Sequence, residues 1–132
     1  MTIGITLRRE VRSRAGDRCE YCGLEQDEFP FAVFHVEHII ARQHGGTDEA
    51  ENLCLACHWC NLHKGPNIAT LVEGQMVSLF HPRRDRWSEH FVRQGDLIVG
   101  LTPVGAGTVL LLDMNDDDRR RIRVPRLPVS GR

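Results

Sequence analysis

Four of the five cysteines of this chain form two pairs with the spacing Cys-x-x-Cys: Cys19 with Cys22, and Cys57 with Cys60. Two residues between thiolates allow one tight turn to direct both sulfur atoms at a single ion. Two such turns complete a tetrahedral site, so the sequence predicts a structural Zn²⁺ bound by all four cysteines. Four sulfur ligands leave no open coordination position, so we expect this ion to contribute to folding and not to catalysis.

The fifth cysteine leaves a choice of pairing, because Cys54 also stands three residues before Cys57. Residues 52–56 read as a short apolar strand, in which successive side chains point to opposite faces. That geometry favours the pair Cys57 and Cys60 and leaves Cys54 as a small buried side chain. Redox chemistry of the thioredoxin kind is the other interpretation of the cysteines, but it needs a single Cys-x-x-Cys at the start of a helix that follows a strand.

Composition places the chain among ordinary soluble globular proteins. Its 132 residues are typical of one domain, and its hydrophobic fraction of 41% and charged fraction of 27% are usual values. Aromatic residues make up only 6%, so we expect something besides a large core to help hold the fold together. The net charge of −1 argues against a strongly basic protein that binds nucleic acid through charge alone. The arginines nevertheless gather in three places, which read most simply as solvated faces: residues 8–14, 83–86 and 119–126.

Two further features concern location. No segment approaches the ~18 apolar residues of a membrane span, and the start of the chain lacks the layout of a secretory signal. We therefore expect a cytoplasmic protein with no membrane partner. In such a reducing compartment, paired cysteines indicate a metal site before a disulfide.

The expected elements are short and mixed. A helix is predicted for residues 6–15, with Gly16 as its C-cap, and a strand for residues 29–37. A polar loop with Gly45-Gly46 then leads to a strand that starts at Asn52 and to a short helix that Gly65-Pro66 ends.

The second half of the chain is less distinctive. Strands are predicted for residues 76–80 and 96–99, and Trp87 and Phe91 are spaced as one helical turn that packs against the core. Residues 107–114 are an apolar run too short to distinguish helix from strand. Residues 116–121 place three acids before three arginines, which fits a helix and its dipole, and Pro125 and Pro128 indicate a loose tail. This half is expected either to brace the first half or to touch nucleic acid.

The chain resembles the HNH endonuclease family, the zinc-knuckle branch of the ββα-metal nucleases, over about residues 17–67. The motifs appear in the family's order: Cys19-x2-Cys22, Glu37-His38-Ile39, Gly45-Gly46, Asn52-Leu53 and Cys57-x2-Cys60-Asn61-x2-Lys64-Gly65. Residues 76–91 also look like an extension found in one bacterial subgroup. The resemblance implies an α+β fold, in which a single domain over residues 1–132 contains a small ββα-metal module, an N-terminal helix and a C-terminal α/β extension over about 76–125.

The resemblance also implies roles for individual residues. His38 would be the general base that activates water, and Glu37 would bind a catalytic divalent ion. The amide of Asn52 would bond loop backbone and so hold His38 in place. The third family position is often histidine but is Asn61 here, and an amide oxygen shifts the preference toward Mg²⁺ or Mn²⁺.

Helix geometry bears on the neighbours of Asn61. His63 is an alternative ligand. Residues that are two apart on a helix differ by about 200° in direction, however, so Asn61 and His63 face opposite sides. Lys64 lies three residues after Asn61 on the same face and is therefore predicted to contact phosphate. His58 has the same spacing but lies within the knuckle turn and stays unassigned, while Trp59 is expected to pack.

Other candidates are weaker. Arg42 and His44 would be either phosphate contacts or exposed loop residues, and His35, His81 and His90 are expected to be structural or at the surface. The leading hypothesis is a metal-dependent endonuclease that hydrolyses DNA. The alternative is a non-catalytic zinc-ribbon-like module that binds nucleic acid or protein. That alternative explains the cysteines but gives no reason for the polar set formed by Glu37-His38, Asn52 and Asn61.

Overall fold

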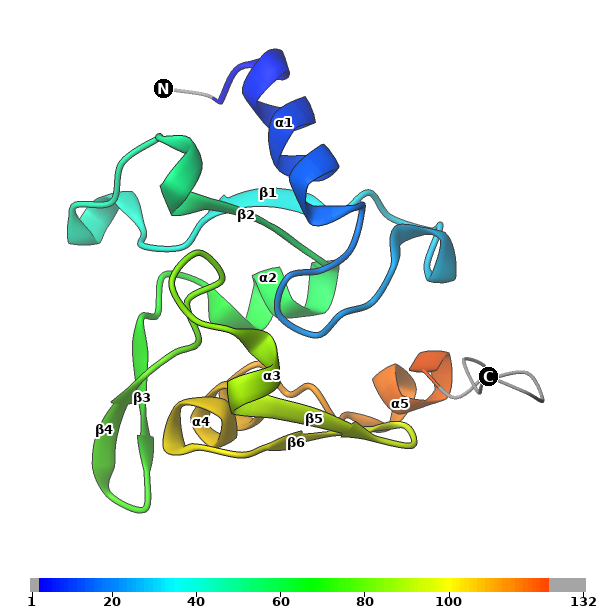
Figure 1. The fold of residues 1–132 in the computed structure, drawn as a ribbon, viewed down its shortest axis with the longest axis vertical. Helices are drawn as coiled ribbons and strands as arrows, with labels where there is room; N and C mark the ends of the chain where they lie inside the picture. Colours follow the sequence, from blue (N-terminus) through cyan, green and yellow to red (C-terminus); the bar gives the residue numbers. More distant parts are fainter. Residues whose placement is uncertain (1–2, 124–132) are drawn as a thin grey trace.

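The structure is a computed structural model and describes residues 3–123. Its strands form three separate antiparallel hairpins, and its helices lie between and beside them (Figure 1). The expected mixture of helix and strand is confirmed. The elements in chain order are α1 (Ile5–Ala15), β1 (His35–His38), β2 (Leu53–Ala56), α2 (His58–Lys64), β3 (Ala69–Val72), β4 (Gln75–Ser78), α3 (Trp87–His90), β5 (Phe91–Gln94), β6 (Leu97–Gly100), α4 (Pro103–Leu111) and α5 (Asp117–Arg123).

Helix α1 packs on the β1–β2 hairpin through its apolar side, on which Val11 is fully buried. It ends as predicted at Gly16, which has a φ of 64° and whose N–H donates to the carbonyl of Ser13. Two arginines of this helix are structural, because Arg12 donates to the carbonyl of Phe34 at 2.6 Å and Arg14 to that of Leu53 at 2.7 Å.

The strand predicted for residues 29–37 is wrong over most of its length, because β1 begins only at His35. The side chain of Gln26 forms hydrogen bonds with the backbone of the segment just before β1. Its amide donates to the carbonyls of Phe29 and Ala32 and accepts from the N–H of Phe34. Those groups are therefore used within a loop and are not available to a neighbouring strand.

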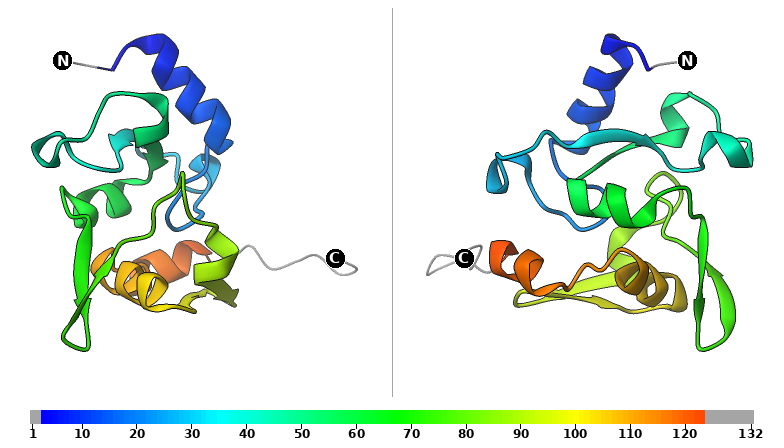
Figure 2. Two further views of the ribbon diagram at one scale, coloured as in Figure 1. Left: turned by 60° about the vertical axis from the view of Figure 1, so that its left-hand side comes forward. Right: turned by 180° about the vertical axis from the view of Figure 1, so that it is seen from behind.

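The module predicted from the resemblance has the order strand, loop, strand, helix. Strands β1 and β2 pair so that Glu37 lies opposite Cys54 and His38 opposite Leu53. Helix α2 follows at once, with Cys57 as its N-cap, and packs under the hairpin (Figure 2). Strand β2 is buried along its whole length, so the hairpin is anchored from both sides.

The C-terminal extension consists of two hairpins, β3–β4 and β5–β6, that both contact α4 (Figure 1). Gly107 allows the close approach of α4 to β3, since a Cβ there would come within 2.9 Å of a methyl carbon of Thr70. The undecided run at residues 107–114 is thus helical in its first part, and the predicted strands appear as β4 and β6. Helix α5 is also as predicted.

One expectation for this half, the helical turn shared by Trp87 and Phe91, is wrong. Trp87 begins α3, but Phe91 begins β5, so the two do not share a helix, although their rings lie 5.0 Å apart. Pro125 and Pro128 lie outside the described residues.

One hydrophobic core joins both halves of the molecule. Buried side chains from the knuckle region and from the extension belong to the same cluster, among them Tyr21, Leu55, Phe80, Phe91 and Met114. Within residues 3–123, none of the helices has the length and apolar character needed to cross a membrane.

Candidate active site and zinc centre

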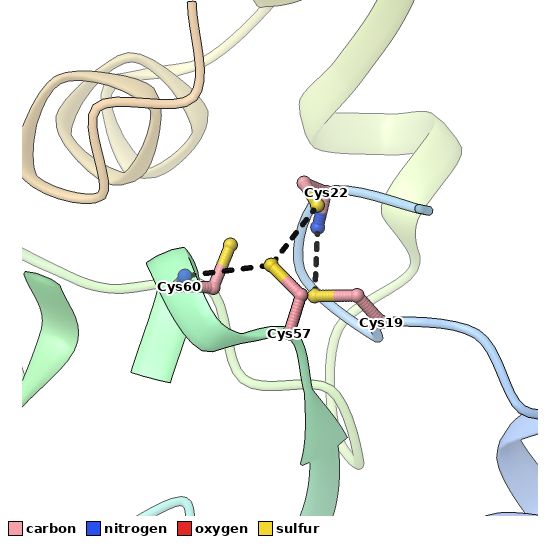
Figure 3. Close-up of side chains that lie close together, drawn as sticks. All are labelled: Cys19, Cys22, Cys57 and Cys60. Atoms are coloured by element: carbon pink, nitrogen blue, oxygen red, sulfur yellow. Dashed lines mark hydrogen bonds between the residues drawn. The ribbon is translucent and has the colours of Figure 1, made fainter. Parts of the chain in front are cut away.

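Cys19, Cys22, Cys57 and Cys60 come together in a buried cluster between the two knuckle turns (Figure 3). Their sulfur atoms all lie within 4.8 Å of one another, and those of Cys22 and Cys57 are 3.8 Å apart. A tetrahedral zinc site with Zn–S bonds of about 2.3 Å needs sulfur atoms roughly 3.8 Å apart. In each pair, the backbone N–H of the second cysteine points at the sulfur of the first at 3.5 Å. The four residues therefore fit a structural zinc ion.

Cys54 stays outside this cluster, as predicted. Its thiol is fully buried behind β1 and donates to the hydroxyl of Tyr21 at 3.7 Å. Burial raises the pKa of the Cys54 thiol, which leaves it neutral. The pairing of Cys57 with Cys60 is the one that the geometry supports.

Arg119 of α5 is a partner of the zinc centre that sequence reasoning missed. Its guanidinium donates to the sulfur of Cys60 at 2.9 Å and lies 3.9 Å from that of Cys57. It is also stacked over the ring of Trp59, 5.8 Å from the ring centroid. Four thiolates around one Zn²⁺ carry a net charge of about −2, so a buried cation at this distance offsets part of it. No local spacing could reveal this contact, because Arg119 lies 59 residues beyond Cys60.

The extension also holds the first knuckle from outside. Arg83 forms an ion pair with Glu20, whose other carboxylate oxygen accepts from the N–H of Leu55 at 2.8 Å. The indole N–H of Trp87 donates to the carbonyl of Tyr21 at 2.7 Å. The C-terminal half therefore braces the zinc-binding module.

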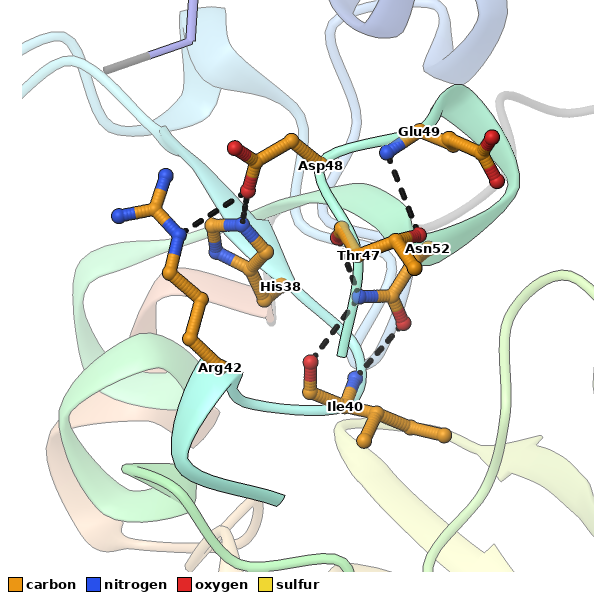
Figure 4. A network of polar contacts seen from close by, with 7 residues as sticks. All are labelled: His38, Ile40, Arg42, Thr47, Asp48, Glu49 and Asn52. Atoms are coloured by element: carbon orange, nitrogen blue, oxygen red, sulfur yellow. Dashed lines mark hydrogen bonds and ion pairs between the residues drawn. The ribbon is translucent and has the colours of Figure 1, made fainter. Parts of the chain in front are cut away.

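His38, the candidate catalytic histidine, lies at the end of β1 and is half-buried. Its Nε2 is 2.7 Å from Oδ1 of Asp48, and Nε of Arg42 donates to the same oxygen at 3.0 Å (Figure 4). These hydrogen bonds from His38 and Arg42 lower the pKa of Asp48, so the carboxylate is ionised and accepts. A neutral His38 then carries its proton on Nε2, and Nδ1 is left as an acceptor. Asp48 was not predicted; its only sequence signal is that it is the first acid after Gly45-Gly46.

Asn52 ties the loop that follows His38 to β2. Its Oδ1 accepts from the N–H of Ile40 at 2.9 Å, and its Nδ2 donates to the carbonyls of Ile40 and Thr47 (Figure 4). Gly46 is needed here for space, because a Cβ would lie 1.7 Å from the carbonyl oxygen of Ile40. This is the backbone bonding that was expected of the Asn52 amide.

Glu37 has a buried carboxylate oxygen, Oε1, with no hydrogen-bond partner among residues 3–123. Burial raises its pKa to about 7, and the charge of Lys64 acts in the opposite direction. A buried carboxylate without a donor is costly unless a cation binds it. Within residues 3–123, Glu37 thus has a buried carboxylate oxygen that is left for a ligand.

The prediction for Lys64 is wrong. This side chain is only 1% exposed, and its ammonium donates to the carbonyl of Ile39 at 2.9 Å. The C-terminal turn of α2 packs against the end of β1, so the ammonium is used inside the module and cannot reach a phosphate on its surface.

The other residues of α2 divide between its two sides. Asn61 is half-buried, and within residues 3–123 its side-chain amide makes no hydrogen bond, whereas His58 and His63 are exposed. Trp59 packs as expected, with its ring 4.7 Å from that of Phe29. The amide oxygen of Asn61 is therefore available for a ligand.

The last two candidates are at the surface of the loop. Arg42 is paired with Asp48 but still about half exposed, and His44 is exposed at the end of the same 3₁₀ turn (Arg42–His44). Both positions are compatible with a phosphate contact.

Comparison with known proteins identifies the module. Residues 19–67 match the sequence model of the HNH endonuclease family. The matched segment begins at the first zinc knuckle and ends just after α2, so it contains all four cysteines and the polar set around His38. Searches among curated proteins and among solved structures found no significant match. Residues 19–67 of this chain are therefore similar to the HNH endonuclease family.

Proposed function

We propose that this chain is a metal-dependent endonuclease that hydrolyses phosphodiester bonds of DNA, with His38 as the general base. The observation that carries the proposal is the pair of neighbours on β1: an oriented imidazole at His38 and a buried, unpartnered carboxylate at Glu37. A protein that only used its cysteines to bind zinc and a partner would have no use for either.

His38 would take the proton from the attacking water on Nδ1, because Nε2 is engaged with Asp48. The ionised Asp48 keeps the ring in this tautomer and stabilises the imidazolium that forms. Asn52 fixes the loop on which this geometry depends, through its three bonds to backbone groups.

Glu37 and Asn61 would supply oxygen ligands from β1 and from α2, two elements in contact with each other. Oxygen ligands favour Mg²⁺ or Mn²⁺. Such an ion would stabilise the charge that develops on the phosphate and the leaving oxygen. Arg42 and His44, on the loop beside His38, are the candidates for holding the neighbouring phosphate.

A nicking assay on supercoiled DNA tests this function. The purified zinc-loaded protein is assayed with Mg²⁺ or Mn²⁺, and the metal-free control omits these ions instead of adding a chelator, which would also remove zinc. We expect His38→Ala to lower the rate by at least ~10²-fold, the usual contribution of a general base. His35→Ala is the matched control, because it removes an exposed histidine from the other end of the same strand.

The outcomes separate the alternatives. Full activity of His38→Ala would refute the assigned base. Absence of cutting by the wild type, with DNA binding retained, would favour the non-catalytic binding module. Loss of activity in His63→Ala but not in Asn61→Ala would exchange their roles. An RNA substrate of the same sequence shows whether the activity is specific for DNA.

A further inference from the structure

A groove runs between the loop after His38 and the extension. It consists of two adjoining cavities of about 300 and 240 Å³ that share Ile40, His81 and Arg84. The larger is lined by apolar residues and also by Lys64, and the smaller is lined by His44, Gly45 and Gly46 of the loop after His38. Figure 1 shows the segment between β4 and α3 rising from the extension toward the β1–β2 hairpin. His81 and Arg84 of this segment line both cavities.

The turn that carries the extension's side of the groove is rigid. The N–H groups of Arg84 and Asp85 both donate to the carbonyl of His81, and the carboxylate of Asp85 accepts from the N–H of His81 at 2.9 Å. Just before the turn, Phe80 is buried, and its N–H donates to the hydroxyl of Thr108 in α4 at 2.9 Å. The side chains on this turn are therefore presented from a fixed base.

Two of these side chains have donors to offer. Nδ1 of His81 accepts from the N–H of Arg83 at 3.2 Å, and burial lowers the pKa of His81, so the neutral ring carries its proton on Nε2. Arg84 is exposed, and within residues 3–123 its guanidinium has no hydrogen bond or ion pair. Arg83 differs, because it is committed to Glu20.

We propose that Arg84 and His81 of the extension, together with His44 of the HNH loop, bind a backbone phosphate of the nucleic acid in this groove. The proposal rests on the proposed function and adds a contact outside the HNH domain. A guanidinium matches two phosphate oxygens, and an N–H donor from each side of the groove completes the recognition. Contacts of this kind fix the register of the strand and carry no base specificity.

Two acids also line the groove and act against an anion. Asp85 is already used within its own turn, whereas Glu51 lies exposed at the edge of the smaller cavity. Because the whole chain has a net charge of −1, a local cation such as Arg84 matters more for binding DNA. Glu51 also offers a test in the opposite direction.

The test measures DNA affinity in the zinc-loaded His38→Ala background without Mg²⁺, by fluorescence anisotropy of a labelled duplex over a salt series. We expect Arg84→Gln to weaken binding about 5- to 10-fold and to reduce the slope of log Kd against log salt by about one. His81→Asn keeps an acceptor near Nδ1 but loses the Nε2 donor, and should weaken binding about threefold. Glu51→Gln should tighten binding by a similar factor.

Arg86→Gln is the matched control, because Arg86 is exposed on the same segment but lines neither cavity. Equal effects of Arg84→Gln and Arg86→Gln would overturn the proposal, as would an absence of measurable DNA binding at low salt. Competition by inorganic phosphate gives a third arm. Loss of phosphate binding in Arg84→Gln with unchanged DNA affinity would show a small-anion site and would also overturn it.

The result is separable from the fate of the proposed function. If Arg84→Gln weakens DNA binding but the wild type never cuts DNA, the phosphate-binding groove is supported and the nuclease function is refuted. If Arg84→Gln, made in the protein that retains His38, cuts DNA at the normal rate and with an unchanged KM, the nuclease function is supported and the phosphate-binding groove is refuted.

Discussion

The zinc centre and the candidate catalytic cluster are neighbours on α2, where Cys60 and Asn61 are consecutive, yet they are built in opposite ways. The four-cysteine site is buried, made of sulfur, and approached by two knuckle N–H groups and by the guanidinium of Arg119 in the distant α5. The candidate catalytic cluster is partly exposed, made of oxygen and nitrogen, and contains a Glu37 carboxylate oxygen that has no hydrogen-bond partner among residues 3–123. The sulfur site fixes α2 against the hairpin, and the neighbouring polar groups of α2 and β1 are thereby held in place without satisfying one another.

Removal of one zinc ligand should have the largest effect. Cys57→Ser is expected to abolish stoichiometric zinc binding and cooperative unfolding, because a structural zinc site contributes on the order of 10 kcal/mol to folding. Zinc content and thermal unfolding followed by circular dichroism measure this. Cys54→Ser is the matched control, since it should retain zinc and lose no more than about 2 kcal/mol. Zinc loss in Cys54→Ser alone would show that the pairing is wrong.

The second prediction concerns the unsatisfied carboxylate and its pH dependence. The pKa of Glu37 is raised to about 7 by burial, above its ordinary value of 4.5. The unfolded chain therefore releases this proton first as pH rises, so the free energy of unfolding falls between about pH 4.5 and 7. The fall should be roughly 2–3 kcal/mol, since each pKa unit corresponds to ~1.4 kcal/mol.

Glu37→Gln should lack this fall. Urea unfolding of both zinc-loaded proteins at pH 5 and pH 7.5 measures the difference, which cancels the contributions of other groups. Mg²⁺ should restore stability to the wild type at pH 7.5 and not to the variant. Equal pH dependence in the two proteins would contradict the buried state of Glu37.

Loss of the Arg119 guanidinium, which reaches the cysteine cluster from α5, should lower the affinity for zinc. Arg119→Gln should weaken zinc binding by about 10-fold, as is usual when a hydrogen-bond partner of a metal ligand is lost. Competition with a chromogenic zinc chelator measures the affinity directly. Arg121→Gln is the control, because Arg121 is exposed and, among residues 3–123, forms its ion pair with Asp118 of its own helix. If both variants retain the same affinity, Arg119 does not support the metal site.

An effect of the same size as that of Arg119→Gln is expected at Asp48. Asp48→Asn should lower kcat by about 10-fold and leave KM nearly unchanged, because the amide no longer stabilises the imidazolium of His38. Glu49→Gln, on the adjacent exposed residue, serves as control. Stopped nicking time courses at saturating DNA give kcat for both. A change in KM alone would assign Asp48 to DNA binding.

Much of the site was accessible from sequence because its motifs depend on local geometry. Each Cys-x-x-Cys makes its own turn, and the prediction of Cys54 as a buried side chain needed only the alternation of a strand. The face of α2 that carries Asn61 was also predictable from helix periodicity. The same argument failed for Lys64, because periodicity gives a direction around the helix but not what lies there. Here the ammonium of Lys64 is buried against the carbonyl of Ile39, just after β1, while Asn61 stays partly exposed.

The order and spacing of cysteines, histidine and asparagines thus predicted by themselves the four-cysteine cluster and the similarity of residues 19–67 to the HNH family, since these features need only a turn, a strand and one helix. Tertiary structure alone decided that Asp48 orients His38, that Arg119 supports the zinc ligands and that Lys64 is internal. These contacts join side chains through space, and their energies depend on burial and distance, which no spacing along the chain records.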